Sequence, residues 1–304
     1  MIMLFLPLAA AALTSPRAVG PRMMDSLMRE RMPNAFLSFQ PTFIVTDWAA
    51  IPRLMEAYVD HARSENGCSY CGWSRCEDRL FVSEAHRDAD ALVDHLNGVA
   101  PIVAQLLAGA AALERAELHG PASSFDACRN IVDELTDGRA QYFASLPGAF
   151  SFFSKQTGGM MTGQSFCSLR PMLTVSDMAA AQPLLDSYLE RVAAQPGCIY
   201  TGFTRCEKSG NALFCREAHS NADAMISHLE IVRPILQALC DGPAALERLE
   251  LHGPSMQLAR VRAAVEAGEL LVEGVPIRYL TLGGGFQRFE AWSSYVAQPK
   301  PRFG

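Results

Sequence analysis

Histidine recurs in this chain in a regular pattern, and an imidazole can take up or release a proton near neutral pH. Six of the seven histidines form three pairs at equivalent positions of two similar stretches: His86 and His219, His95 and His228, and His119 and His252. Glu84 and Glu217 precede the first pair by two residues. Residues two apart on a strand share a face, and a neighbouring carboxylate fixes the tautomer of an imidazole and raises its pKa. We predict two proton-handling pairs, with surface ion pairs as the alternative.

The second histidine pair lies on a predicted helix, beside the apolar stripe of that helix. His95 is adjacent to Leu96, so we expect its side chain between the helix and the sheet. His95 and His228 are therefore candidate catalytic bases, and half-buried histidines bonded to backbone carbonyls are the alternative. His119 and His252 are each followed by Gly-Pro, which favours a structural turn.

A predicted strand before each glutamate carries side chains that suit an aromatic substrate. The candidate substrate-binding residues are Tyr70, Trp73 and Arg75 in one stretch and Tyr200, Phe203 and Arg205 in the other. Strand alternation puts Tyr70 on one face and Trp73 and Arg75 on the other. A tyrosine hydroxyl can bond a phenolic substrate, whereas a core tyrosine with a satisfied hydroxyl is the alternative.

The two stretches are copies of one sequence. Residues 67–77 correspond to residues 197–207 at an offset of 130 residues, and Glu84-Ala85-His86 corresponds to Glu217-Ala218-His219 at an offset of 133 residues. The difference falls in a Ser-Gly-Asn segment, which is typical of a hairpin turn where length changes easily. The sequence therefore predicts a tandem duplication.

Each copy is expected to have the element order β-α-β-β-α-β. In the first copy we predict strands near residues 42–46, 68–76, 80–86 and 113–118, with helices capped by Asp47 and Asp88. Pro101 and Pro234 are expected to kink or split the second helices. A helix (125–135; 258–267) and a strand (141–146; 277–282) extend each copy, and glycines 283–285 predict a turn.

The predicted fold class is α+β, with two ferredoxin-like (β-α-β-β-α-β) repeats and C-terminal helix-strand extensions. A sheet with helices on one face leaves its other face bare, so we expect the two sheets to pack as a pseudo-dimeric α/β barrel. The predicted organisation is a presequence or disordered N-terminus (1–36), copy one (37–153), a linker (154–166), copy two (167–290) and a C-terminal tail (291–304).

Composition and charge narrow the partners and the compartment. The net charge of −6 disfavours nucleic acid as the main partner. Beyond the N-terminus no apolar run predicts a stable membrane span in the mature chain. Residues 1–13 are apolar and an arginine-bearing stretch follows, which is typical of a signal or transit peptide. Secretion, import into an organelle such as a plastid, and a cytoplasmic location all remain open.

The nine cysteines predict buried thiols, with a secreted disulfide framework as the alternative. Cys68, Cys71 and Cys76 have the residue type of a metal site. Thr201 stands where the second copy would need the equivalent of Cys71, so no shared metal site is predicted.

The element order and one local pattern resemble the antibiotic biosynthesis monooxygenase (ABM) domain family of the dimeric α/β-barrel superfamily. The pattern is a strand ending in glutamate, an acidic helix start and a helix histidine, at residues 80–96 and 213–229. The resemblance implies monooxygenases that act on phenols, anthrones or quinols without a cofactor. A haem-degrading branch expects an Asn on the first strand, and residues 43–45 and 173–175 contain none.

Two functions remain open. The first is an ABM-like cofactor-independent monooxygenase that acts on a small aromatic or quinol-type substrate in an apolar pocket, with no cofactor and no metal. The second is a non-catalytic dimeric α/β-barrel protein that binds an apolar small molecule or a protein partner. Both expect the two copies to pair within one chain. RNA binding is disfavoured because the strands lack a basic and aromatic pattern.

Overall fold

The computed structural model describes residues 29–33, 36–154, 160–162, 166–268, 270 and 277–288. The first half of the chain, residues 38–145, comprises β2 (Ser38–Val45), α1 (Ile51–Ser64), β3 (Cys68–Cys76), β4 (Arg79–His86), α2 (Ala89–Gln105), β5 (Ala111–Gly120), α3 (Phe125–Thr136) and β6 (Ala140–Ser145). The second half, residues 167–288, comprises β9 (Cys167–Val175), α4 (Met178–Ala193), β10 (Cys198–Cys206), β11 (Ala212–His219), α5 (Ala222–Cys240), β12 (Ala244–Gly253), α6 (Ser255–Ala267) and β13 (Ile277–Arg288).

Three further strands lie outside the two halves: β1 (Arg29–Pro33), β7 (Phe150–Ser154) and β8 (Met160–Thr162). Strand β1 pairs with β7, and β8 pairs with β13. The predicted linker therefore contains a strand. The apolar start of the predicted presequence and the predicted C-terminal tail lie outside the described residues.

Ten strands close into a barrel in the order β10-β11-β9-β12-β13-β3-β4-β2-β5-β6, and β6 pairs back to β10. The last strand of each half is parallel to its own neighbour, β5 or β12, and antiparallel to a strand of the opposite half. Because both junctions join strands of different halves, the barrel closes only when the two halves pair.

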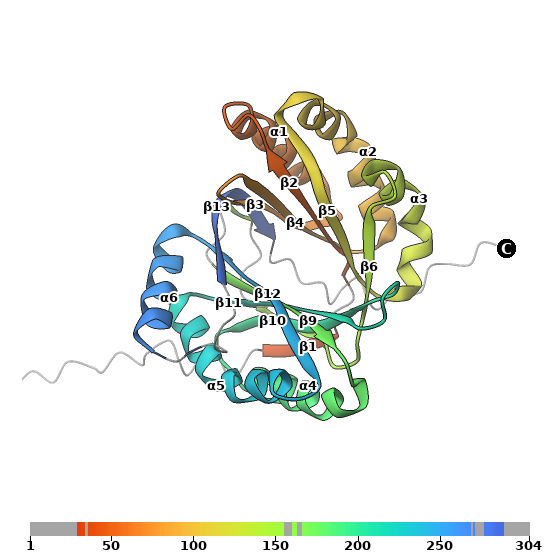
Figure 1. Ribbon diagram of the computed structural model, residues 1–304. Coiled ribbons are helices and arrows are strands. Elements are labelled where there is room, and N and C mark those ends of the chain that lie inside the picture. Colours follow the sequence, from red (N-terminus) through yellow and green to blue (C-terminus); the bar gives the residue numbers. More distant parts are fainter. Residues whose placement is uncertain are drawn as a thin grey trace, which may run out of the picture.

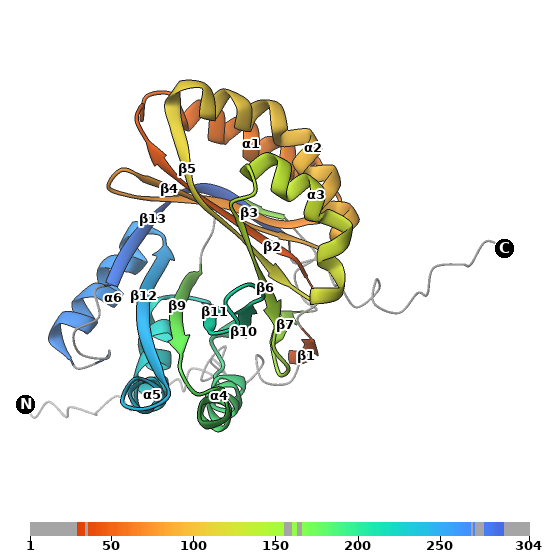
Figure 2. The same cartoon turned by 45° about the vertical axis from the view of Figure 1, so that its right-hand side comes forward.

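The α-helices cover the barrel in two groups. Helices α1, α2 and α3 lie on one side of the barrel and α4, α5 and α6 lie on the opposite side (Figures 1 and 2). The same element order, β-α-β-β-α-β-α-β, occurs in both halves. The α+β class predicted from the sequence is confirmed.

Each helix group encloses an apolar core against the outer face of the barrel. Tyr58 of α1 and Tyr188 of α4 occupy equivalent positions in these cores and are 5% and 0% exposed. By length and composition alone, one helical segment among the described residues, Ala89–Ala110, could cross a membrane. This segment consists of α2 and a short π-helix at Leu106–Ala110, and Leu92, Leu96 and Val99 on it are buried.

One local prediction about a helix cap was wrong, and of the two outcomes predicted for the helix prolines, a kink or a split, the split does not occur. Asp47 does not cap α1, which begins at Ile51 after Ala50; Asp47 instead accepts a hydrogen bond from the Ala49 amide (2.9 Å) in the preceding turn. Pro101 and Pro234 do not split their helices, which run through both positions. Burial of the helix face against the barrel outweighs the hydrogen bond that an interior proline removes.

The predicted glycine turn at residues 283–285 is also wrong, because these glycines lie inside β13. The pairing of β13 with β3 shifts register between Leu282 and Gly284. A side chain at Gly283 would collide with the Trp73 ring, and Gly285 has a φ of 153°, which L side chains rarely adopt. The glycines let the strand pass over a bulky indole.

Candidate functional site

Five side chains of the first half meet between the barrel and its helices, and we name them the first-half cluster: Tyr58 and Glu65 of the α1 region, Glu84 and His86 of β4, and His95 of α2. Nε2 of His86 and Nε2 of His95 lie 2.9 Å and 3.1 Å from one oxygen of Glu84. The Tyr58 hydroxyl donates to the other oxygen. On its far side, Nδ1 of His95 donates to Glu65 at 2.8 Å. The predicted contact between Glu84 and His86 is present, but the pair is buried rather than on the surface.

The two carboxylates of this cluster determine its charges. Burial alone would lower the pKa of His95, but Glu84 and Glu65 raise it to about 10, so His95 is an imidazolium at neutral pH. Burial alone would raise the pKa of Glu84, yet His95 and His86 hold it well below its usual range. Burial lowers the pKa of His86 and, with the Glu84 charge, raises that of Tyr58. The cluster is therefore an ion pair flanked by a neutral histidine and a neutral tyrosine.

Equivalent positions of the second half form the second-half cluster: Tyr188 of α4, Gln195, Glu217 and His219 of β11, and His228 of α5. Tyr188 donates to Glu217 at 2.6 Å, and Nε2 of His228 lies 3.0 Å from the same oxygen. Nδ1 of His228 contacts the side-chain oxygen of Gln195 at 3.1 Å, where the first half has Glu65. His219 lies 3.8 Å from Glu217, beyond hydrogen-bond reach.

Burial also shifts the ionisation of the second-half cluster. It lowers the pKa of His219 to about 4, with a further contribution from neighbouring His228. Burial alone would raise the pKa of Glu217, but His228 and His219 hold it well below its usual range. Burial and the Glu217 charge raise the pKa of Tyr188. At neutral pH His219 is a neutral imidazole with a free lone pair, and Glu217 is a carboxylate.

An apolar cavity of about 30 Å³ adjoins the first-half cluster. It lies between β2, β4 and β5 of the barrel and α1, α2, α3 and the π-helix at Leu106–Ala110. Its lining includes Phe43, Leu96, Leu106 and Tyr58, and the Tyr58 hydroxyl contacts Glu84 and lies 3.2 Å from Nε2 of His95. Tyr58 therefore connects an apolar chamber to the ionised groups.

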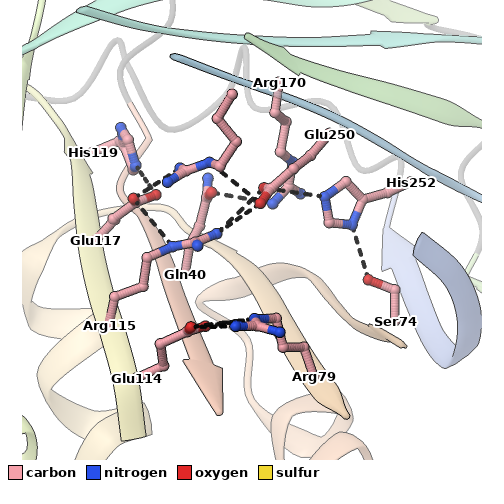
Figure 3. Close-up of polar contacts among 11 residues, drawn as sticks. Gln40, Ser74, Arg79, Glu114, Arg115, Glu117, His119, Arg170, Glu250 and His252 are labelled. Carbon is pink, nitrogen blue, oxygen red and sulfur yellow. Dashed lines mark hydrogen bonds and ion pairs between the residues drawn. The ribbon is translucent and has the colours of Figure 1, made fainter. Parts of the chain in front are cut away.

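A second polar system fills the barrel interior, where Arg115 points between Glu117 and Glu250 (Figure 3). Arg115 of the first half bonds Glu250 of the second, and Arg248 of the second bonds Glu117 of the first, each at 3.0 Å. The exchange is reciprocal, because Arg115 and Arg248, like Glu117 and Glu250, are equivalent residues of the two halves. These contacts join the halves through buried charge pairs.

The third histidine pair belongs to this interior. Nδ1 of His119 contacts Thr204 of the other half at 2.9 Å, and Nδ1 of His252 contacts Ser74 at 2.8 Å. Burial lowers the pKa of His119 to about 4 and that of His252 to about 3, so both are neutral. The predicted role of these histidines in a turn was wrong, because their strands continue through them into Gly120 and Gly253.

The remaining interior charges have fewer carboxylate contacts. Arg170 donates to Gln40 (3.1 Å) and to Ser83 (2.8 Å). Burial lowers the pKa of Arg216 to about 10, and Arg216 lies over the Phe36 ring at 5.1 Å.

The barrel wall separates the predicted substrate-binding residues. Tyr70 and Tyr200 face the interior, where Tyr70 packs on Phe166 at 5.5 Å between ring centroids and Tyr200 lies 3.5 Å from Ser168. Trp73 and Phe203 face the helices and join the apolar cores that contain Tyr58 and Tyr188.

Arg75 and Arg205 are exposed, and neither lines the apolar cavity beside the first-half cluster. Both are near the end of their strands, and Arg75 lies over the Trp48 ring at 5.6 Å. A guanidinium at that position remains hydrated at no desolvation cost, which explains why it turns outward.

The sequence interpretation missed the tyrosines and the amide or acid that complete each cluster. Tyr58 and Tyr188 fit the apolar helix stripe, so nothing in the periodicity distinguishes them from core residues. Glu65 and Gln195 are near helix ends, and only the tertiary fold brings them to the second histidine pair. Recurrence of a tyrosine at the same offset in both copies was the available signal.

None of the nine cysteines forms a disulfide within the described part of the chain. Seven are buried, as the sequence predicted, and Cys76 and Cys240 are partly exposed.

No family model matches this chain, and no curated protein matches its sequence. Among solved structures, MupZ from Pseudomonas fluorescens is similar over 36% of this chain and 90% of its own, with 25% identity and a TM-score of 0.33. A candidate monooxygenase from Fusobacterium nucleatum is similar over 72% and 91%, with 11% identity and a TM-score of 0.48. An anthrone oxidase-like protein is similar over 86% and 98%, with 11% identity and a TM-score of 0.35. At these TM-scores the similarities carry no conclusion about the activity of this chain.

Proposed function

We propose that this protein is an ABM-like cofactor-independent monooxygenase for a small aromatic or quinol-type substrate, and that the first-half cluster is its active site. The observation that carries the proposal is the position of Tyr58. Tyr58 lines the apolar cavity, and its hydroxyl contacts Glu84 and His95. A substrate ring in an enlarged cavity would meet this hydroxyl as its polar neighbour.

The first step is removal of a substrate proton through Tyr58. The hydroxyl takes the proton while it passes its own to Glu84, the group to which it already donates. The imidazolium of His95 lies against both residues and balances the substrate anion that forms. When the positive charge of His95 also interacts with the substrate anion, it stabilises the Glu84 carboxylate less. The pKa of Glu84 then rises, which favours proton transfer to Glu84.

The substrate anion supplies the electrons for the second step. For an anthrone-type CH2 group, the carbanion forms a C–O bond with O2, and the resulting peroxide anion takes up a proton. Loss of water from the hydroperoxide leaves a carbonyl, so CH2 and O2 become C=O and H2O. The substrate is oxidised by four electrons and O2 is reduced by four, hence no external reductant is required.

The cavity must enlarge to admit a substrate, because 30 Å³ holds only a few atoms. The π-helix at Leu106–Ala110 supplies Leu106 and Leu107 to the cavity lining. π-helical turns are weaker than α-helical ones and are frequent at functional sites. We assign the opening to this turn; in the second half, the corresponding part of α5 is α-helical to Cys240.

We further propose that the chain arose by duplication of a ferredoxin-like unit, with copy one at residues 37–153 and copy two at residues 167–290. The reciprocal pairs Arg115 with Glu250 and Arg248 with Glu117 support it. A fused pair of units gains the intramolecular partner that a half-barrel needs, and it leaves one cluster free to diverge.

A non-catalytic barrel that binds an apolar small molecule or a protein is the second candidate. The small volume of the cavity favours it, since Glu84 and His95 do not line that cavity directly. In this alternative the first-half cluster only stabilises the folded core, and Tyr58 has no catalytic role.

The experiment is oxygen uptake by the full chain with anthrones and hydroquinones, compared with Tyr58→Phe. We expect uptake by the unmodified protein and a fall in kcat of about 100-fold or more in the variant, the usual contribution of a positioned proton carrier. Tyr142→Phe is the control, because Tyr142 also donates to a carboxylate, Asp133 at 2.7 Å, but lies outside the cavity. No uptake with either substrate class, or equal kcat in the two variants, contradicts the proposal.

A further inference from the structure

The second-half cluster presents metal-ligand atoms that its protein contacts do not satisfy. Glu217, His219 and His228 are fully buried, and one donor atom from each lies within 4.8 Å of the others. Neither ring nitrogen of His219 has a hydrogen-bond partner among the described residues. Buried imidazole nitrogens are almost always paired, so an unpaired one beside a carboxylate indicates a missing positive partner.

We propose that Glu217, His219 and His228 bind a divalent first-row transition-metal ion, such as Zn²⁺ or Fe²⁺. Two imidazoles and one carboxylate are the donor set that such ions prefer, whereas Mg²⁺ and Ca²⁺ favour oxygen ligands alone. The site does not depend on the proposed oxygenase activity, which belongs to the other half.

The spacing of the donor atoms supports the proposal. Nε2 of His228 and Nε2 of His219 lie 3.0 Å and 3.8 Å from the two oxygens of Glu217. A tetrahedral ion with bonds of about 2.1 Å separates its ligand atoms by roughly 3.4 Å. The two contacts involve different oxygens of Glu217, and each distance lies close to this separation, so each histidine needs only a small movement.

The neighbouring contacts orient the same atoms. Nδ1 of His228 is directed at the Gln195 oxygen, so Nε2 faces Glu217. A metal-bound histidine usually donates its other nitrogen in this way. Tyr188 donates at 2.6 Å to the same Glu217 oxygen that His228 contacts, and so holds this carboxylate in place.

The first half has the same residue types but a different arrangement. Nε2 of His86 and Nε2 of His95 both contact Glu84, at 2.9 Å and 3.1 Å, and Glu65 adds a second carboxylate to His95. In the first half the imidazolium of His95 therefore already compensates the buried Glu84 carboxylate. We therefore assign one ion to each chain, in the second half.

The test uses Co²⁺ as the probe, because its visible d–d bands report coordination. The full chain is produced in medium supplemented with Co²⁺, so that the buried site is filled during folding, and desalted protein is measured by metal analysis and absorption. We expect one ion per chain, bound with the strong visible bands of a four- or five-coordinate ion. His219→Ala and Glu217→Gln should lose at least about 90% of it, as expected for loss of a direct ligand.

His86→Ala and Glu84→Gln are the matched controls at the equivalent positions of the first half, and they should retain the ion. Glu217→Gln is nearly isosteric and replaces His219→Ala if the latter does not fold. Absence of Co²⁺ in the desalted unmodified protein overturns the proposal, and this readout needs no variant. Two ions per chain, or equal loss in the first-half controls, overturns its assignment to the second half.

Discussion

The two clusters contain the same tyrosine, glutamate and histidine pair, yet the strand histidine is hydrogen-bonded to the glutamate in the first half and not in the second. In the first half both histidines contact Glu84, while in the second half His219 stands 3.8 Å from Glu217. The residue near the end of the first helix also differs, Glu65 against Gln195. Equivalent positions in a duplicated chain can therefore hold the same residue types and offer different chemistry.

The largest difference is expected from neutralising each glutamate. Glu84→Gln should lower the free energy of unfolding by about 3–5 kcal/mol, because it removes the more deeply buried of the two carboxylates that compensate the His95 charge. Glu217→Gln in metal-free protein should cost less, since His219 does not contact Glu217. Urea denaturation of both variants at pH 7 measures the difference, and equal losses would mean that the clusters are equivalent.

The pH dependence of stability should also separate the clusters. The pKa of His95 is raised to about 10 from 6.5, so its contribution is complete below about pH 6.5 and is lost as pH rises towards 10. The groups that face it are Tyr58, His61 and Glu65 from α1 and Glu84 and His86 from β4.

Glu65→Gln gives the first half the amide that the second half has at this position. We expect it to reduce the loss of unfolding free energy between pH 6.5 and pH 10 by about 2 kcal/mol, the value of one hydrogen bond to a charged group. Urea denaturation at pH 6, 8 and 10 measures it. An unchanged pH profile would show that Glu65 does not set the charge of His95.

A smaller difference between the halves is expected at the equivalent aromatic residues of β3 and β10, which are Trp73 and Phe203. Gly283→Ala should destabilise the protein by about 1–2 kcal/mol, because the added methyl group meets the Trp73 ring. Trp73→Phe should relieve the collision, so a double-mutant cycle by thermal unfolding should show coupling between the two positions. Additive effects would place the strain elsewhere.

The smallest effects are expected where the halves agree. Ser74→Ala and Thr204→Ala each remove the hydroxyl that contacts a buried histidine of the other half. Each should cost about 1 kcal/mol in chemical denaturation, the usual value of one buried hydrogen bond. If the losses of unfolding free energy in the two variants differed by well over that value, the contacts that the two halves exchange in the barrel interior would not be equivalent.

Local patterns in the sequence account for much of this arrangement. The offsets of the repeat predicted which residues correspond, and strand alternation predicted the contact between Glu84 and His86. Alternation also separated Tyr70 from Trp73, which lie on opposite faces of the barrel wall.

The features of the site that the sequence did not predict depend on contacts between elements that are far apart in the chain. Tyr58 fits a helix stripe, and its link to Glu84 exists only after α1 packs on β4. The exposure of Arg75 depends on where the barrel wall ends. Likewise the spacing of His219 and Glu217 reflects packing differences of a fraction of an ångström, which residue type does not encode.

His95 differs from His228 in having a second carboxylate partner, Glu65 in place of Gln195, and nitrogen NMR of labelled histidine measures the resulting charge of His95 directly. His95 is expected to be an imidazolium at neutral pH and to lose its proton only near pH 10. A neutral His95 at pH 7 would remove the charge that balances the substrate anion beside Tyr58, and it would contradict the assignment of the active site to the first half.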